Sequence, residues 1–232
     1  MPAPIIPILG PSLRFPPASE APRQGLVALG GDLSVERLLA AYRSGIFPWS
    51  AAPITWWSPD PRAIFEFDDV HVSRSLRKTL RREVFRTTLN QCFGQVIRAC
   101  ATAPRHGDDT WISPAIIEAY DRLHRAGWAH SLEVWKGDQL AGGIYGVGIG
   151  GFFAGESMFH HVSDASKVAV VCLLEYLQSR GYVLFDTQML TETTRSLGAV
   201  EITRIAYLER LKAATDLPVT FGAPPGNSEN AS

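Results

Sequence analysis

The chain has 232 residues and a formal net charge of −1, with 46% hydrophobic and 19% charged residues. That length allows one large domain or two small ones, and the composition excludes general disorder. Because positive and negative residues nearly balance, a contact with nucleic acid needs a local basic patch. The three cysteines form no CxxC pair, which argues against a disulfide framework and for a reducing compartment. No apolar run reaches the roughly 18 residues of a membrane span and no signal peptide is recognisable, so we expect a cytoplasmic protein.

Proline sets the first part of the chain apart. Eleven of the 16 prolines lie in residues 1–62. Proline fixes φ and removes a backbone donor, so we expect a small, turn-rich and irregular N-terminal domain over this range. One helix interrupts it, with Ser34 as the N-cap of VERLLAAYR and Gly45 just past its end.

The pattern changes at residue 63 and predicts a second, α+β domain over 63–232, with a mostly antiparallel sheet and a mobile C-terminal tail from Asp216. The strands expected from apolar runs are AIFEF, FRTTL, WAHSLEVWK, QLAGGIYGVGIGG, FFAGESMF, YVLFDTQ and VEITRIAYL. The helices expected from caps and apolar spacing are HVSRSLRKTLRR capped by Ser73, QCFGQVIRACA capped by Asn90, AIIEAYDRLHRA after Ser113-Pro114, KVAVVCLLEYLQSR capped by Ser163, and TETTRSLG.

Two sequence motifs resemble known functional sites but lack the structural context that those sites need. GVGIGG at 146–151 fits G-x-G-x-x-G, but a dinucleotide site needs a helix after it and FFAGESMF predicts a strand, so a glycine-rich hairpin turn explains it better. His160 and His161 near Ser163 and Asp164 suggest a hydrolase triad. Triad members come together from separate elements, so a capped helix start is the simpler interpretation. The histidines lack metal-ligand spacing, and no metal site is expected.

A cluster of cations is more informative. Residues 71–86 hold six basic side chains and one acid, a local charge of +5. On a helix, five of the six follow the spacing i, i+3, i+4, i+7, i+8 and share one face: Arg74, Arg77, Lys78, Arg81 and Arg82. This basic face is either a solvated helix surface or a footprint for a phosphate backbone.

Three polar residues interrupt apolar strands. Asp186 and Gln188 end the strand YVLFDTQ, and the period of two puts both side chains on one face of the sheet. Asp186 either hydrogen-bonds local backbone or, together with Gln188, faces a substrate ammonium. Glu156 poses the same question, because it lies in the otherwise uncharged strand FFAGESMF, where an acid is costly unless it binds a cation.

Three aromatic residues, Trp49, Trp111 and Tyr120, lie near loops or helix starts. Taken singly, each suits a core position, but such residues also form stacking platforms for a base or ring. The residues alone therefore predict an α+β protein with a basic helix and an acidic site at a strand end.

The chain as a whole resembles a known family, the leucyl/phenylalanyl-tRNA–protein transferases. The resemblance runs from about Phe15 to Leu211 and rests on four segments in matching order: GLVALGGDLSVERLLAAYRSGIFPWS, WWSPDPRAIF, GGIYGVGIGGFFAGESMF and FDTQ. It implies a small N-terminal domain and a C-terminal domain with an N-acetyltransferase-like (GNAT-like) fold. It also implies transfer of Leu or Phe, and Met more weakly, from aminoacyl-tRNA to the α-amino group of proteins that begin with Arg or Lys. In bacteria this marks them for degradation by the N-end rule.

The resemblance also implies roles for residues. Trp49, Trp111 and Tyr120 would hold the terminal adenosine, Glu156 would pair with the basic side chain of the acceptor, and the basic face would contact the tRNA. The side chain of the donor amino acid would enter an apolar pocket lined by Ile144, Phe153, Val170, Leu173, Leu177, Phe185 and Thr187. No cofactor is implied, because the aminoacyl ester is already activated, and we expect a monomer.

For the chemistry, we expect Asp186 to hold the acceptor ammonium and to polarise Gln188, whose carbonyl oxygen accepts a hydrogen bond from the amine. HHVSDASK, before the long apolar helix, lacks the glycines that bind a pyrophosphate, so no coenzyme A site is expected. Two alternatives remain. One is an acyltransferase of the same fold with a small thioester donor, against which the missing glycines count. The other is a non-catalytic RNA-binding module, against which the buried acids count.

Overall fold

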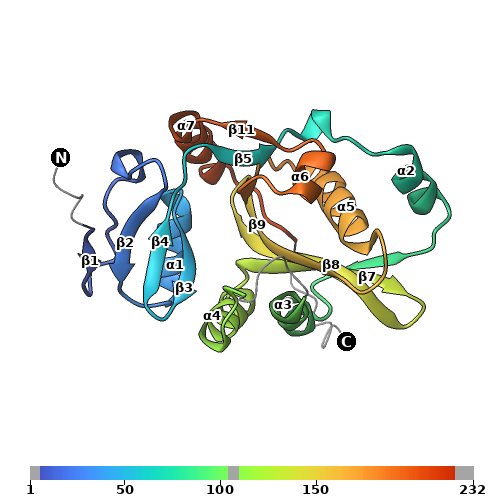
Figure 1. Cartoon of the computed structure of the whole chain (residues 1–232), viewed down its shortest axis with the longest axis horizontal. Coiled ribbons are helices and arrows are strands. Elements are labelled where there is room, and N and C mark those ends of the chain that lie inside the picture. Colours follow the sequence, from blue (N-terminus) through green and yellow to red (C-terminus); the bar gives the residue numbers. More distant parts are fainter. Residues whose placement is uncertain (1–5, 104–109, 223–232) are drawn as a thin grey trace, which may run out of the picture.

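The computed structural model describes residues 6–103 and 110–222. Two sheets organise this part of the chain: a four-stranded sheet in the order β1-β2-β4-β3 and a seven-stranded sheet in the order β11-β5-β10-β9-β8-β7-β6. Figure 1 shows the smaller sheet and α1 at one end of the molecule and the larger sheet, with its helices, filling the rest. Two sheets side by side create the boundary at which the candidate site lies.

The N-terminal part is an ordered sheet, so the prediction of an irregular segment is wrong. Its elements are β1 (Ile8–Leu9), η1 (Ala18–Glu20), β2 (Leu26–Gly30), α1 (Val35–Arg43), β3 (Phe47–Ala51) and β4 (Ile54–Trp57). The prolines are compatible with a sheet because Pro48 lies on β3, an edge strand, and Pro53 lies in the β3–β4 turn. The helix α1 has the predicted bounds, and the Ser34 hydroxyl accepts the backbone N–H of Arg37 at 3.3 Å.

The larger sheet is mixed: five of its strand pairings are antiparallel, but one pairing at its centre is parallel, which the sequence does not predict. Its strands are β5 (Arg62–Phe65), β6 (Arg86–Leu89), β7 (Ala129–Lys136), β8 (Gln139–Ile149), β9 (Phe152–His160), β10 (Leu184–Gln188) and β11 (Val200–Ile202). At its centre β9 and β10 run parallel, whereas their other neighbours β8 and β5 pair antiparallel. The strands β8 and β9 form a hairpin with Gly150 at φ +57°, which confirms the turn interpretation of GVGIGG.

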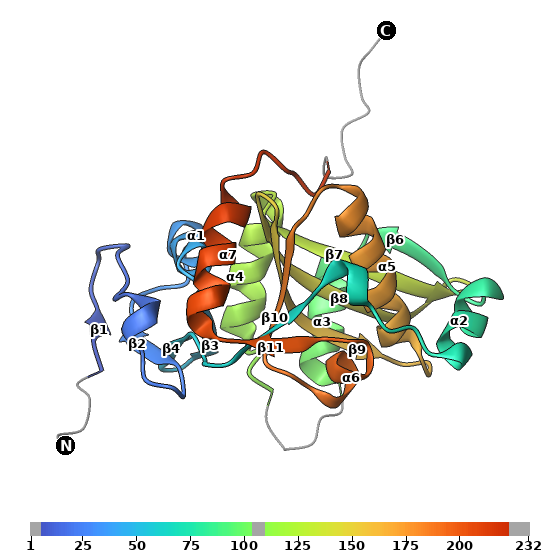
Figure 2. The same cartoon turned by 90° about the horizontal axis from the view of Figure 1, so that it is seen from above.

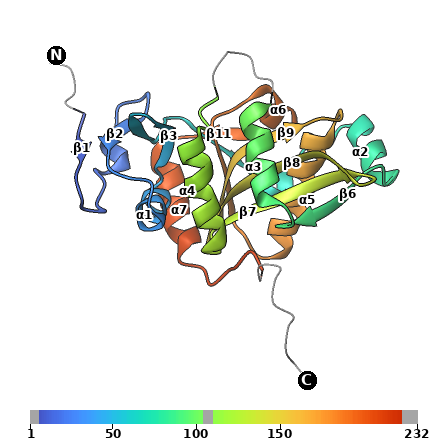
Figure 3. The ribbon, with the colours of Figure 1, turned by 90° about the horizontal axis from the view of Figure 1, so that it is seen from below.

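Helices cover both faces of the larger sheet. They are η2 (Phe67–Asp69), α2 (Arg74–Arg81), α3 (Phe93–Thr102), α4 (Pro114–Arg125), α5 (Ala165–Ser179), α6 (Glu192–Ser196) and α7 (Arg204–Thr215). Figure 2 shows α5 on the upper face, and Figure 3 shows α3 and α4 on the lower face. Adjacent residues of one strand enter different cores: Phe185 joins the α5 side, and Leu184 joins the side of α3 and α4.

Two predicted helix caps are wrong. The helix α3 begins after Cys92, and the Asn90 side chain instead accepts the backbone N–H of Ser131 at 2.9 Å. The helix α5 begins after Asp164, which has φ +68° and makes no side-chain capping bond, so Ser163 is not the cap. In both places the helix starts later than the predicted cap, and at Asn90 the side chain bonds to the neighbouring strand residue Ser131 instead of the helix.

The predicted strand VEITRIAYL is correct only for its first three residues, which form β11. Thr203 then accepts the backbone N–H of Ala206 at 3.3 Å and starts α7. The helix buries Tyr207, Leu211 and Ala214, which are spaced as one helical face. It packs against β9 and β10 and against α1 and η1, and so joins the two sheets.

The start of the predicted mobile tail is packed. Phe221 is buried, its ring stacks on His130 with centroids 4.0 Å apart, and its carbonyl accepts the Tyr176 hydroxyl. The rest of that tail lies outside the described residues. Over residues 6–103 and 110–222, no helix has the length and apolar composition needed to cross a membrane. The same ranges contain no group of three His, Cys, Asp or Glu side chains that could hold a metal ion.

Candidate active site

A cavity of about 780 Å³ lies between the two sheets, where β9 and β10 separate. Pairing between these strands runs as far as Asp186 opposite Ala154. The residues that follow turn toward the cavity and line it: Gly155, Glu156, Thr187 and Gln188. Since β3 supplies the facing wall, the cavity has contributions from both sheets, and its volume suits a small organic ligand.

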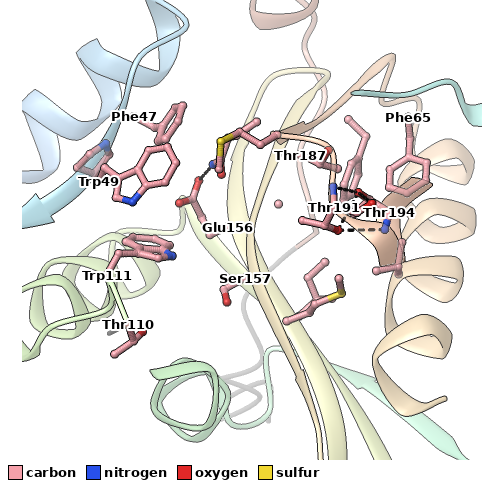
Figure 4. Close-up of a pocket in the computed structure, with 18 of the residues that line it drawn as sticks. Phe47, Trp49, Phe65, Thr110, Trp111, Glu156, Ser157, Thr187, Thr191 and Thr194 are labelled. Atoms are coloured by element: carbon pink, nitrogen blue, oxygen red, sulfur yellow. Dashed lines mark hydrogen bonds between the residues drawn. The ribbon is translucent and has the colours of Figure 1, made fainter. Parts of the chain in front are cut away.

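One end of the cavity is aromatic. Trp49 comes from β3, and Trp111 comes from the segment before α4; both are half-buried and line the cavity. Figure 4 shows them on the same side of the cavity, next to Glu156. The Trp49 ring packs edge-to-face with Trp57, with ring centroids 5.5 Å apart, and its centroid lies 5.9 Å from that of Phe47. Two half-exposed indoles at one opening can stack on a planar ring.

The other end is apolar, and it is lined by four of the seven residues that we expect around the donor side chain. Ile144, Val170, Phe185 and Thr187 line the cavity as expected, and Phe65 and Met158 complete this wall. Three predicted residues lie in the core behind it: Phe153, Leu173 and Leu177. The rings of Phe153 and Phe185 stack at 5.5 Å, so Phe185 separates Phe153 from the cavity.

Glu156 lies between the two ends, in a chain of hydrogen bonds. The Gln188 side-chain nitrogen Nε2 donates to Glu156 Oε1 at 2.7 Å, and the Tyr120 hydroxyl donates to Oε2 at 3.2 Å. Tyr120 is in turn hydrogen-bonded to the hydroxyl of Tyr42. Burial raises the pKa of Glu156 to about 7, although the tyrosine hydroxyls favour the ionised form. Tyr120 is fully buried behind Glu156 and does not line the cavity.

Asp186 also lies outside the cavity and is fully buried. Its Oδ1 accepts from Arg62 Nε at 2.9 Å and from the Gln188 backbone N–H at 2.7 Å. Its Oδ2 accepts from Arg62 Nη2 at 2.6 Å and from the Tyr207 hydroxyl at 2.9 Å. The cation that faces this carboxylate is therefore Arg62. The prediction that Asp186 itself holds a substrate ammonium is wrong for this geometry, because both oxygens are engaged within the protein.

A β-bulge separates Asp186 from Gln188. The register against β5 shifts between the two residues, and Gln188 has φ +62°, a left-handed value that is uncommon outside glycine. The simple period of two predicts both side chains on one face of the sheet, but the bulge interrupts that period and directs Gln188 toward Glu156 while Asp186 stays buried outside the cavity.

Sequence reasoning missed three residues of this site: Tyr42, Arg62 and Tyr207. Arg62 opens the apolar strand RAIF, and a charged residue there is a usable signal, because a buried acid such as Asp186 requires a buried cation. Tyr207 was hidden by the incorrect strand assignment over VEITRIAYL. Tyr42 belongs to the buried face of α1 and carries no signal beyond core packing.

Asp186→Asn should destabilise the protein by about 3–5 kcal/mol, because it leaves the buried charge of Arg62 without its partner. Urea unfolding measures this loss. Glu118→Gln, which breaks the exposed pair with Arg122, is the control and should cost no more than about 0.5 kcal/mol. Similar small losses for both variants would mean that the buried pair contributes no more than an exposed one.

The basic face lies on α2, far from the small sheet in Figures 1 and 3. The helix begins as predicted, with the Ser73 hydroxyl accepting the Leu76 N–H at 3.2 Å. The five cations are exposed and line a shallow cavity of about 240 Å³: Arg74, Arg77, Lys78, Arg81 and Arg82. No ion pair between described residues includes any of them. The five charges remain available to an external anion.

Comparison with known proteins gives a consistent result. The family model for leucyl/phenylalanyl-tRNA protein transferase matches residues 64–212, and the model for the N-terminal domain of that family matches residues 31–60. A leucyl/phenylalanyl-tRNA–protein transferase of Magnetococcus marinus is 52% identical over 215 residues, covering 90% of this chain and 91% of that protein. One from Azotobacter vinelandii is 51% identical over 213 residues, covering 90% and 94%.

Among solved structures, the chain is similar to L-PGS from Bacillus licheniformis, at 10% identity and a TM-score of 0.42. The match covers 68% of this chain and 53% of that chain. This likeness is too weak to assign a fold.

Proposed function

Because the chain belongs to the leucyl/phenylalanyl-tRNA–protein transferase family, and is therefore an aminoacyltransferase from tRNA to protein, we propose that it moves Leu or Phe, and Met more weakly, to proteins that begin with Arg or Lys. The observation that carries this proposal is that one cavity combines an aromatic end, an apolar end and the buried carboxylate of Glu156 between them. The product would enter N-end-rule degradation, and the enzyme would act in the cytoplasm as a monomer.

The donor spans the cavity in this proposal. Its terminal adenosine stacks on Trp49 and Trp111, and its aminoacyl side chain enters the apolar end against Val170 and Phe185. We assign residues 1–62 to a small N-terminal domain that supplies Trp49 of the aromatic end through β3. We assign residues 63–232 to a GNAT-like domain that supplies Trp111 and the apolar end. This division is supported by the separate sheets, each built from one of the two ranges apart from Arg62, which opens β5.

The acceptor's Arg or Lys side chain pairs with Glu156 in this proposal. Glu156 is 8% exposed and lines the cavity, and its carboxylate accepts from two neutral donors, Gln188 and Tyr120. A buried carboxylate that faces a cavity favours a cationic ligand, since an ion pair offsets its desolvation. Tyr120 and Tyr42 then serve to orient Glu156 rather than to hold the adenosine.

The reaction needs one proton transfer and no cofactor. The acceptor's amine nitrogen, in its neutral form, attacks the ester carbonyl carbon, the bond from that carbon to the ribose oxygen breaks, and the amine proton passes to that oxygen. The products are the peptide bond and a free ribose hydroxyl. Because Gln188 Nε2 donates to Glu156, the Oε1 of the same amide is the atom that accepts an N–H bond from the attacking amine. Asp186 acts through Gln188 and does not touch the substrate.

A transfer assay tests the proposal. Enzyme is mixed with labelled Leu-tRNA and with peptides that begin with Arg, Lys or Ala. The proposal predicts labelled product from the first two peptides and little from the third. Equal labelling of all three peptides would remove Glu156 as the acceptor-reading group, and labelling of none would refute the proposed reaction.

We also propose that the basic face on α2 contacts the tRNA backbone. Arg77→Ala with Arg81→Ala should weaken tRNA binding and lower the salt slope of binding by about one for each lost phosphate contact. Leucine transfer from aminoacyl-adenosine, a donor without the tRNA body, should be unaffected. Filter binding over a salt series measures the slope. If the variant loses activity equally with both donors, the face has a structural role only.

A further inference from the structure

Arg62 links both walls of the cavity without lining it. It is 1% exposed, and its two hydrogen bonds to Asp186 form a fork of 2.9 and 2.6 Å. On the other wall, its Nη1 donates to the carbonyl of Gly45 at 3.2 Å, and its guanidinium lies 4.9 Å from the Phe47 ring centroid. Phe47 opens β3 and neighbours Trp49.

The carboxylate held by Arg62 fixes the backbone of Gln188. A glutamine at φ +62° stays in that sparsely populated region only if its surroundings hold it there. The one side-chain acceptor described for its N–H is Asp186 Oδ1, at 2.7 Å. The fork to Arg62 sets the plane of this carboxylate, and the Tyr207 hydroxyl, 2.9 Å from Oδ2, supports it. The position of the Gln188 side chain therefore depends on Arg62 through one intermediate residue.

We propose that Arg62 is a positioning residue for the transfer reaction: it holds Asp186 so that the left-handed Gln188 points its amide at the acceptor amine, and it ties this point to the β3 wall that receives the donor. The inference rests on the proposed function. Buried arginines often serve stability alone, so the test must separate positioning from folding.

Arg62→Lys makes that separation. Lysine keeps a charge opposite Asp186, so the buried carboxylate stays paired, but a single ammonium cannot reproduce the fork or the bond to Gly45. We expect kcat for transfer to fall about 100-fold, as for a small misplacement of a reacting group, while KM for donor and acceptor stays unchanged. If Arg62 had a purely structural role, Arg62→Lys would lower the melting temperature without a selective loss of kcat.

Arg37→Lys is the matched control. Arg37 is also fully buried, and it also joins one aspartate, Asp32, with backbone carbonyls, here those of Gly10 and Ser12. It lies in the small sheet region and lines no part of the cavity. This variant should lose stability comparable to Arg62→Lys but keep the wild-type kcat.

A second readout does not depend on activity. The backbone amide proton of Gln188 donates to the Asp186 carboxylate at 2.7 Å. Because this hydrogen bond is short and charge-assisted, the proton should resonate far downfield in an NMR spectrum of protein labelled with ¹⁵N-glutamine. It should move upfield in Arg62→Lys and stay in place in Arg37→Lys. Tyr207→Phe, which removes one hydroxyl, should fold normally, shift the resonance less and reduce kcat by a smaller factor.

The outcomes are distinct. A wild-type enzyme without transfer activity would refute the proposed function, and the NMR shift would still test the positioning. With an active wild type, the inference fails if Arg62→Lys loses no more kcat than Arg37→Lys, or if its Gln188 resonance is unmoved. If Arg62→Lys does not fold, Tyr207→Phe decides by the same two criteria.

Discussion

Glu156→Gln should abolish most of the recognition of a basic acceptor, at a cost of about 2–5 kcal/mol in kcat/KM for an Arg-starting peptide. Glutamine keeps the shape of the side chain, and its amide oxygen still accepts from Gln188, whereas its amide nitrogen donates to the Tyr120 hydroxyl instead of accepting from it. The substitution removes the negative charge that we propose pairs with the acceptor. Steady-state transfer to Arg- and Ala-starting peptides measures the effect. Binding of aminoacyl-tRNA should persist.

The control for Glu156→Gln is Glu133→Gln. Glu133 is another fully buried glutamate of the same sheet, and it accepts from Ser131 and Thr88 outside the cavity. This variant should lose stability but keep the preference for Arg over Ala. An unchanged preference in Glu156→Gln would show that acceptor recognition lies elsewhere.

The raised pKa of Glu156 gives this prediction a pH dependence. Because burial moves the pKa to about 7, the carboxyl is mostly neutral at pH 6 and mostly ionised at pH 8. Only the ionised form attracts a cation, so inhibition by N-acetyl-arginine amide, which has no α-amino group of its own to titrate, should strengthen as pH rises through 7. In Glu156→Gln the inhibition should be weak and independent of pH.

Gln188→Gly should reduce the single-turnover transfer rate by about 10²–10³, the usual cost of one well-placed polar group at a reacting centre. Glycine accepts the left-handed backbone at this position without strain and removes only the side chain. Folding, followed by thermal melting, should therefore survive, and the affinity for aminoacyl-tRNA should change little.

The control for Gln188→Gly is Asp164→Gly, which relieves a similar left-handed backbone at φ +68° before α5. It lies outside the cavity, so its transfer rate should match the wild type. A folded Gln188→Gly enzyme with a normal rate would return Gln188 to a structural role in the bulge.

Much of this fold follows from local sequence signals. Ser34, Ser73 and Ser113 each begin a helix where a cap is predicted, because an N-cap bond depends on a few neighbouring residues. The antiparallel strands of the larger sheet also follow from short apolar runs. VEITRIAYL fails because its apolar residues suit both a strand and a helix, and the choice depends on packing of α7 between the two sheets.

The candidate site is predictable in its residue types but less so in its geometry. Glu156 and Gln188 are polar residues in apolar strands, and Trp49 and Trp111 lie near a loop or a helix start, so the sequence indicates all four as candidates, and all four line the cavity. Asp186 also interrupts an apolar strand, yet it does not reach the cavity, because its carboxylate pairs with Arg62, 124 residues away along the chain. No local pattern specifies which cation a buried acid meets, nor that a bulge rotates the strand between Asp186 and Gln188.

We propose that donor and acceptor meet at Gln188 in the cavity between the two sheets. The most direct measurement is a crystal structure of the enzyme with leucyl-adenosine whose ester oxygen is replaced by NH, which cannot be transferred. We expect the adenine against Trp49 and Trp111, the leucine side chain against Val170 and Phe185, and the carbonyl carbon next to the Gln188 side-chain amide. An analogue bound elsewhere, or bound in the cavity with its carbonyl turned away from Gln188, would contradict the proposal.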